Sequence, residues 1–212
     1  MSDTMLLDRV LPVYDAVRLE HRVLPAAPAA VWTAVLEADM VRTAEEMPAV
    51  RFLFGARAAA ERIVAALRRE PAAPLPEVES MRLADLPRRG GWILLGTDPP
   101  REVAFGAVGR FWAGETVWEQ VSDESFAAFD RPGLAKVACN FSLRPYGERP
   151  TLVTYECRTQ GTDPSATRAF MRYWRALSPF IGVVLRAQLR MIESTLEEVA
   201  PMDEHPVRFS VD

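Results

Sequence analysis

The chain of 212 residues is long enough for one large domain or two small ones, and its 49% hydrophobic and 25% charged residues are typical of a globular protein. Its net charge of −4 argues against a general nucleic-acid binder, because such a protein needs a concentrated positive surface. Asp3 and Asp8 stand where a signal peptide would need basic residues, and the apolar run 180–185 is far short of the roughly 20 residues that cross a bilayer. We therefore expect a cytoplasmic protein without stable membrane insertion.

The first part of the chain predicts a strand followed by a helix. Residues 16–24 alternate, with Val17, Leu19 and Val23 on one side and charged residues on the other, as in a half-buried strand. Pro28 is well placed to open a helix, because the apolar residues after it recur at helical spacing.

The middle of the chain predicts two short helices and then a meander of strands. Residues 47–70 have helical character but are divided by a proline and a glycine, and 71–76 is a proline-rich loop. A helical turn is expected at 124–129. Strands separated by turn residues are expected over 78–86, 92–97, 102–112, 116–121, 134–144 and 151–161.

The last element is predicted to be the longest. Asp163 and Pro164 have the residue types of a helix cap and first turn, and apolar residues then recur every three or four positions to about residue 200. Pro179 and Gly182 should kink or break this helix about halfway.

This order of elements resembles the START, birch-pollen-allergen and polyketide-cyclase superfamily, often labelled SRPBCC. The local segments that look like this superfamily and its bacterial members are Ala27 to Trp32, Gly106 to Trp112, Phe126 to Phe129, Pro132 to Lys136 and Tyr173 to Arg175. The resemblance implies a single α+β domain over 1–212 with the helix-grip fold, ending in a flexible tail at about 201–212. In that fold a curved antiparallel sheet wraps around a long C-terminal helix, and short helices follow the first strand.

The resemblance also implies a class of function. Members of the superfamily carry lipids, bind plant hormones, cyclise polyketides or act as oxygenase domains. The leading hypothesis is binding of a small hydrophobic or amphipathic molecule in an apolar cavity, on the order of 300 to 1,000 Å³, between sheet and terminal helix. One alternative is a cyclase or aromatase acting in the same cavity, and another is an interaction or homodimerisation module whose cavity is filled by side chains.

Several residues are candidates for lining the cavity. Phe105, Ala107 and Gly109 lie on a central strand, where small residues such as Gly106 and Gly109 would leave volume. Tyr155 could line an apolar cavity and still offer one hydroxyl donor, and Trp174 lies on the apolar stripe of the terminal helix. For each of these residues, plain core packing is the alternative interpretation.

His21 falls in the same register as Val17, Leu19 and Val23, which would point it inward. It could then act as a general base or bind a ligand oxygen, or it could be a satisfied core histidine. With His205 far along the chain, no metal-binding set of residues is visible, and no cofactor motif is present. The catalytic residues of an enzymatic function are therefore not identified.

Asn140, Glu156 and Arg158 are predicted to share the face opposite the apolar residues of the last two strands. If the apolar face is the concave one, Glu156 and Arg158 are a solvated pair. If the register slips at a bulge, the three polar groups would instead line the pocket and hold a ligand head group.

Cys139 and Cys157 are too few for a structural zinc site. If the hairpin turn is centred near 146–149, Cys139 faces Glu156 or Cys157 across the strands. Direct opposition often strains a disulfide, and a reducing cytoplasm opposes one further. We expect two free, buried thiols that contribute packing.

Overall fold

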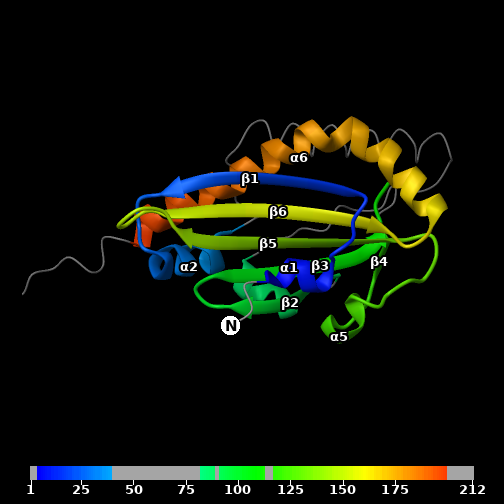
Figure 1. Ribbon diagram of the computed structural model, residues 1–212, viewed down its shortest axis with the longest axis horizontal. Coiled ribbons are helices and arrows are strands. Elements are labelled where there is room, and N and C mark those ends of the chain that lie inside the picture. Colours follow the sequence, from blue (N-terminus) through cyan, green and yellow to red (C-terminus); the bar gives the residue numbers. More distant parts are fainter. Residues whose placement is uncertain (1–3, 40–81, 89–90, 113–116, 200–212) are drawn as a thin grey trace, which may run out of the picture.

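The computed structural model describes residues 4–39, 82–88, 91–112 and 117–199. The expected helices over 47–70, the loop at 71–76 and the tail at 201–212 lie outside these residues. The elements, in chain order (Figure 1), are α1 (Leu6–Val10), β1 (Ala16–Leu24), α2 (Pro28–Glu37), the 3-10 helix η1 (Leu83–Arg88), β2 (Trp92–Asp98), β3 (Glu102–Arg110), β4 (Val117–Glu119), α5 (Asp123–Phe126), β5 (Ala135–Pro145), β6 (Thr151–Gly161) and α6 (Pro164–Val199).

Six strands form one antiparallel sheet in the order β1-β6-β5-β3-β2, with β4 paired to the end of β3. The long helix α6 packs against β1 and β6, and α2 packs against both α6 and β5. Figure 1 shows α6 and α2 with the sheet that they cover. The chain therefore has the expected α+β helix-grip fold, with a short helix after the first strand.

The expected strands are confirmed from residue 92 onward, and the helical turn is α5. The strand expected at 78–86 is wrong in its described part, because 83–88 forms the 3-10 helix η1. Pro87 lies inside this segment, and a proline cannot donate a hydrogen bond to a β-ladder.

Helix α6 begins as the sequence predicts. Asp163 Oδ1 accepts hydrogen bonds from the backbone N–H groups of Ser165 (2.7 Å) and Ala166 (3.1 Å), and Oδ2 accepts one from Gly133 (2.5 Å). The bond from Gly133, followed by those at the helix start, lowers the pKa of Asp163 to about 2. The helix has 36 residues and continues through Pro179, so of the kink or break expected there the break does not occur, and the helix instead follows an arc (Figure 1).

The sheet is covered on both faces. The face under α2 and α6, called the inner face, packs Phe105, Phe141 and Tyr155 with residues such as Leu189 and Ile192 of α6. The opposite, outer face packs a smaller cluster under α1 and α5, made of Leu7, Leu11, Val108, Phe126, Leu134 and Ala138. This arrangement explains why β3 and β5 are buried along almost their whole length.

Strand β1 is turned the other way from the prediction. Val17, Leu19 and Val23 are exposed on the outer face, and the charged residues between them face α6. The alternation of the sequence is compatible with either orientation, because it separates two sets of side chains without showing which set lies inside. Side chains of α6, which lies far along the chain, provide ionic partners for the inward-facing set.

Candidate functional site

A continuous row of aromatic rings crosses the inner face. Tyr155 stacks on Phe141, its partner across β6 and β5, with ring centroids 4.1 Å apart. Phe141 contacts Phe105 at 6.1 Å, and Phe105 contacts Trp92 of β2 at 5.7 Å. Tyr155, Phe141 and Phe105 are buried, whereas Trp92 is half-buried, so the row leads from the middle of the sheet toward its β2 edge.

The row continues toward the start of α6. Trp92 contacts Trp118 of β4 at 6.0 Å, and Trp118 contacts Phe111 at 6.1 Å. Phe111 meets the buried Phe170 of α6 edge-on at 5.8 Å, and Phe170 contacts Trp174 at 5.7 Å. Trp174 is half-buried, which places it at the margin of the core and not in its centre.

A charged cluster lies at the other side of the inner face, between β1 and α6. Glu20 Oε1 accepts hydrogen bonds from Arg18 (2.6 Å) and from Arg186 of α6 (2.7 Å). Burial acts to raise the pKa of Glu20, but the two arginines outweigh it, so that its pKa is lowered. A Cβ added at Gly182 would lie 2.8 Å from Arg18 Cζ, which indicates that this helix glycine makes room for the guanidinium.

A second ion pair extends this cluster along α6. Arg22 binds Glu193, yet its Nε is buried and has no hydrogen-bond partner in the part of the chain that the structure describes. Gln188 Oε1 is also buried without a partner among the described residues. Among the described residues, buried polar atoms without a partner are rare, and two of them belong to Arg22 and to Gln188 of α6.

Tyr155 is the sequence-predicted residue whose position best fits a ligand site. It lies on the inner face, as predicted. Burial is the largest cause that raises its pKa well above the usual range, and the thiols of Cys139 and Cys157 raise it further. The hydroxyl is therefore protonated at neutral pH, where it can donate a hydrogen bond.

The glycines of β3 do not leave the volume predicted for them. Gly106 faces the outer side, where an added Cβ would lie 2.6 Å from Val137 O and 3.2 Å from the Phe126 ring. The space beside Gly109 is filled by the Trp118 ring, 2.9 Å from such a Cβ. Ala107 is buried on the inner face opposite Trp92. The small residues thus permit close packing of neighbouring strands and rings.

His21 does not point inward, so this prediction is wrong. It is exposed on the outer face, where its Nδ1 lies 2.8 Å from the hydroxyl oxygen of Thr154 on β6. His21 therefore cannot serve a ligand bound on the inner face.

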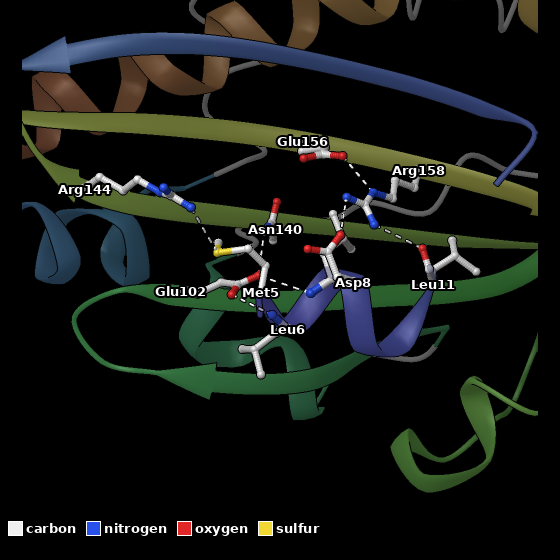
Figure 2. A network of polar contacts seen from close by, with 10 residues as sticks. Met5, Leu6, Asp8, Leu11, Glu102, Asn140, Arg144, Glu156 and Arg158 are labelled. Carbon is white, nitrogen blue, oxygen red and sulfur yellow. Dashed lines mark hydrogen bonds and ion pairs between the residues drawn. The ribbon is translucent and has the colours of Figure 1, made fainter. Parts of the chain in front are cut away.

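Asn140, Glu156 and Arg158 do share the face opposite Tyr155, but neither interpretation of them is correct. Arg158 is buried beneath α1, where it pairs with Glu156 (2.7 Å) and Asp8 (2.8 Å) and donates to Leu11 O. These bonds hold the N-terminal segment on the outer face (Figure 2). The residues are thus neither a solvated pair nor a lining of the inner face.

Next to this network lies a carboxylate that sequence reasoning missed. Glu102 is fully buried and accepts hydrogen bonds from Leu6 N (2.7 Å), Leu7 N (3.2 Å) and Asn140 Nδ2 (2.6 Å); Figure 2 shows it with Leu6 and Asn140. The signal in the sequence is a charged residue directly before the apolar run 103–108 of β3. Its role is to satisfy the first free N–H groups of α1.

The predicted pairing of the cysteines is confirmed in one of its two forms, since Cys139 and Cys157 are direct partners across β5 and β6. Both are free thiols. Cys139 is buried as expected, but Cys157 is half-buried, because it lies on the side toward the edge strand β1 opposite Arg18.

Within the described residues no group of three or more potential metal-ligating side chains occurs. No helix in the same residues has the length and apolar character that a membrane span requires.

The chain shows similarity only to solved structures, since no protein-family model and no curated protein matches it. One is protein MLL2253 from Mesorhizobium loti, at 14% identity and a TM-score of 0.37, over 87% of this chain and 98% of that one. A conserved protein from Geobacillus kaustophilus is 11% identical with a TM-score of 0.40, over 86% and 96%.

The structures found also include the di-domain ARO/CYC protein StfQ from the steffimycin biosynthetic pathway. It is 13% identical with a TM-score of 0.33, and the match covers 88% of this chain and 53% of that one. Because these scores are low, the assignment of the helix-grip fold rests on the sheet order and on the packing of α6.

Proposed function

We propose that this protein binds a small hydrophobic or amphipathic molecule, such as a lipid, a polyketide or an aromatic metabolite, between the inner face of the sheet and α6. The row of rings from Tyr155 to Trp92 is the observation that carries the proposal. Binding sites for such molecules are mostly apolar and aromatic, with a few placed polar groups. The row of rings provides the apolar and aromatic surface.

The polar groups are provided along α6 and by Tyr155. Within the described ranges Arg22 Nε and Gln188 Oε1 are buried without partners, and burial keeps the Tyr155 hydroxyl protonated. The Arg18, Glu20 and Arg186 cluster adds charge at the β1 side. An amphipathic molecule could place its apolar part on the rings and its polar end toward β1.

The distribution of titratable groups supports binding more than proton transfer. Of His21, Tyr155 and Glu156, through which a cyclase could move protons, only Tyr155 lies on the inner face. Its raised pKa makes the hydroxyl a poor base at neutral pH, although a good hydrogen-bond donor.

The proposal is tested by native mass spectrometry of the purified chain, followed by extraction of any bound molecule. In parallel, anilinonaphthalene sulfonate is titrated into the protein and displaced with fatty acids and aromatic carboxylates. We expect saturable probe binding and displacement, and a crystal structure should show a cavity of about 300 to 1,000 Å³ beside Tyr155.

Variants on the two faces of one strand localise the site. Tyr155→Phe, which removes only a hydroxyl, should weaken the best displacing ligand about 2- to 10-fold, the effect of one neutral hydrogen bond. The control Thr154→Val on the outer face of β6 should leave binding unchanged. A fully packed inner face, or equal effects of the two variants, would refute the proposal.

A further inference from the structure

Facing residues of β5 and β6 form either hydrogen-bonded or non-hydrogen-bonded pairs, and the hydrogen bonds at the two ends of the hairpin show to which of these two classes each pair belongs. Tyr146 N donates to Pro150 O (2.8 Å), and Thr162 N donates to Leu134 O (3.0 Å). The register is continuous between these bonds, and hydrogen-bonded and non-hydrogen-bonded pairs alternate along an antiparallel ladder. The even-numbered residues of β5 are therefore hydrogen-bonded, and Cys139 belongs to the other class.

This class brings the two cysteine side chains close together. In non-hydrogen-bonded pairs the Cα atoms are about 4.5 Å apart, and the side chains are closer than in the other class. Disulfides span Cα separations of about 4.4–6.8 Å, so the pair can be bridged without moving the strands. The two thiols are neighbours, since a hydrogen bond that the Cys139 thiol donates to the Cys157 sulfur, followed by burial, raises the pKa of Cys139.

The two thiols differ in access to solvent. Cys139 is only 2% exposed, whereas Cys157 is half-buried on the side toward β1. Cys157 is therefore the more accessible of the two residues. This difference defines an attacking thiol and a resolving thiol.

We propose that Cys139 and Cys157 are a modification site at which a small hydroperoxide forms a reversible cross-strand disulfide. The inference does not require the ligand proposed above, although both cysteines lie on the inner face beside Tyr155. It also differs from the passive packing role that the sequence indicates for these residues.

The reaction balances with one hydroperoxide for each disulfide. Cys157 loses its proton to water, and its sulfur attacks the terminal oxygen of the hydroperoxide. The O–O bond breaks, the leaving alkoxide or hydroxide takes up a proton, and Cys157 becomes a sulfenic acid. Cys139 Sγ then attacks Cys157 Sγ, the S–O bond breaks, and the departing hydroxide leaves as water with the Cys139 proton. Two thiols are oxidised by two electrons, and the hydroperoxide is reduced to an alcohol, or water, plus water.

The position of the cysteine pair in the β5–β6 ladder also explains why the disulfide should be reduced readily. The Cα separation of this pair class lies at the short end of the range for disulfides, and strained disulfides are reduced more readily than relaxed ones. A thiol reductant such as dithiothreitol should therefore restore both thiols.

The test treats the folded, full-length protein with hydrogen peroxide and measures its intact mass and free thiols. We expect a mass loss of about 2 Da, the disappearance of both thiols after denaturation, and peptides linking the two cysteines. Dithiothreitol should reverse all three changes. Circular dichroism before and after treatment checks that the protein stays folded.

Two conservative variants assign the order of attack. In Cys139→Ser the accessible Cys157 should be trapped as a sulfenic acid by dimedone, whereas in Cys157→Ser the buried Cys139 should stay unmodified. If a variant does not fold, the wild-type peptide map still decides the main point. Peroxide treatment that leaves both thiols free, adds oxygen to Cys139 alone, or links two chains would overturn the proposal.

Discussion

Replacing Glu102 by glutamine tests whether the outer face depends on one buried carboxylate. Its Oε2 accepts a hydrogen bond from Leu6 N, and its Oε1 accepts from Leu7 N and Asn140 Nδ2. Glutamine keeps one acceptor oxygen and puts an NH₂ group in place of the other. Asn140 can turn its unpartnered Oδ1 toward that group, but one backbone N–H of α1 then remains unpaired.

The expected loss follows from these bonds. A buried N–H left without a partner costs about 1–3 kcal/mol, and bonds to a charged acceptor are stronger than bonds to a neutral one. Removing a buried charge offsets part of the loss. We expect Glu102→Gln to lower the free energy of unfolding by about 2 kcal/mol. Glu102→Ala leaves three hydrogen-bond donors without an acceptor and should lower it further.

Urea unfolding followed by circular dichroism measures both variants. Glu124→Gln, an exposed carboxylate on α5, is the matched control and should change stability by less than about 0.5 kcal/mol. Hydrogen exchange at the amides of Leu6 and Leu7 should accelerate in the Glu102 variants. If Glu102→Gln matches the control, or if alanine and glutamine have equal effects, the hydrogen bonds are not what stabilises this face.

Three further changes test other parts of the fold. Phe170→Ala, which deletes a ring that is 1% exposed, should lower the free energy of unfolding by about 3–5 kcal/mol in urea; a loss below about 1 kcal/mol would mean that the ring is not core. Gly106→Ala should lower the free energy of unfolding by about 3 kcal/mol or more in the same assay, because its Cβ would lie 2.6 Å from the carbonyl oxygen of Val137. An unchanged free energy of unfolding would contradict this close contact. Because the pKa of Asp163 falls from 3.8 to about 2 on folding, its stabilisation is complete above the unfolded value and is lost as pH decreases through this range. The difference in thermal midpoint between wild type and Asp163→Asn should therefore be constant near neutrality and shrink in strong acid, and a pH-independent difference would refute the role of ionisation.

The sequence predicts the last half of the fold well because its signals are local. β6 begins and ends at the predicted residues, and alternation correctly separates Tyr155 from Glu156. A helix cap, its proline and a long apolar stripe define α6 in the same way. Each of these features depends on residues a few positions apart.

The failures at β1, α1 and Gly109 depend on partners that other elements of the fold provide. The orientation of β1 depends on Arg186 and Glu193, more than 160 residues away in sequence. Helix α1 has only five residues and no pattern of its own, and a carboxylate 96 residues away satisfies its first N–H group. The lining role expected for Gly109 failed because Trp118, from another strand, occupies the space.

The inward-facing charges of β1 give the two borders of α6 opposite responses to ionic strength. Arg18 and Arg186 keep 33% and 43% of their side-chain surface exposed, so dissolved salt screens their attraction to Glu20. The apolar border, where α6 packs through Leu189 and Ile192, is instead strengthened by salts that are excluded from protein surfaces. An excluded salt such as sulfate should therefore weaken the ionic contacts between α6 and β1 and strengthen the apolar contacts of the same helix.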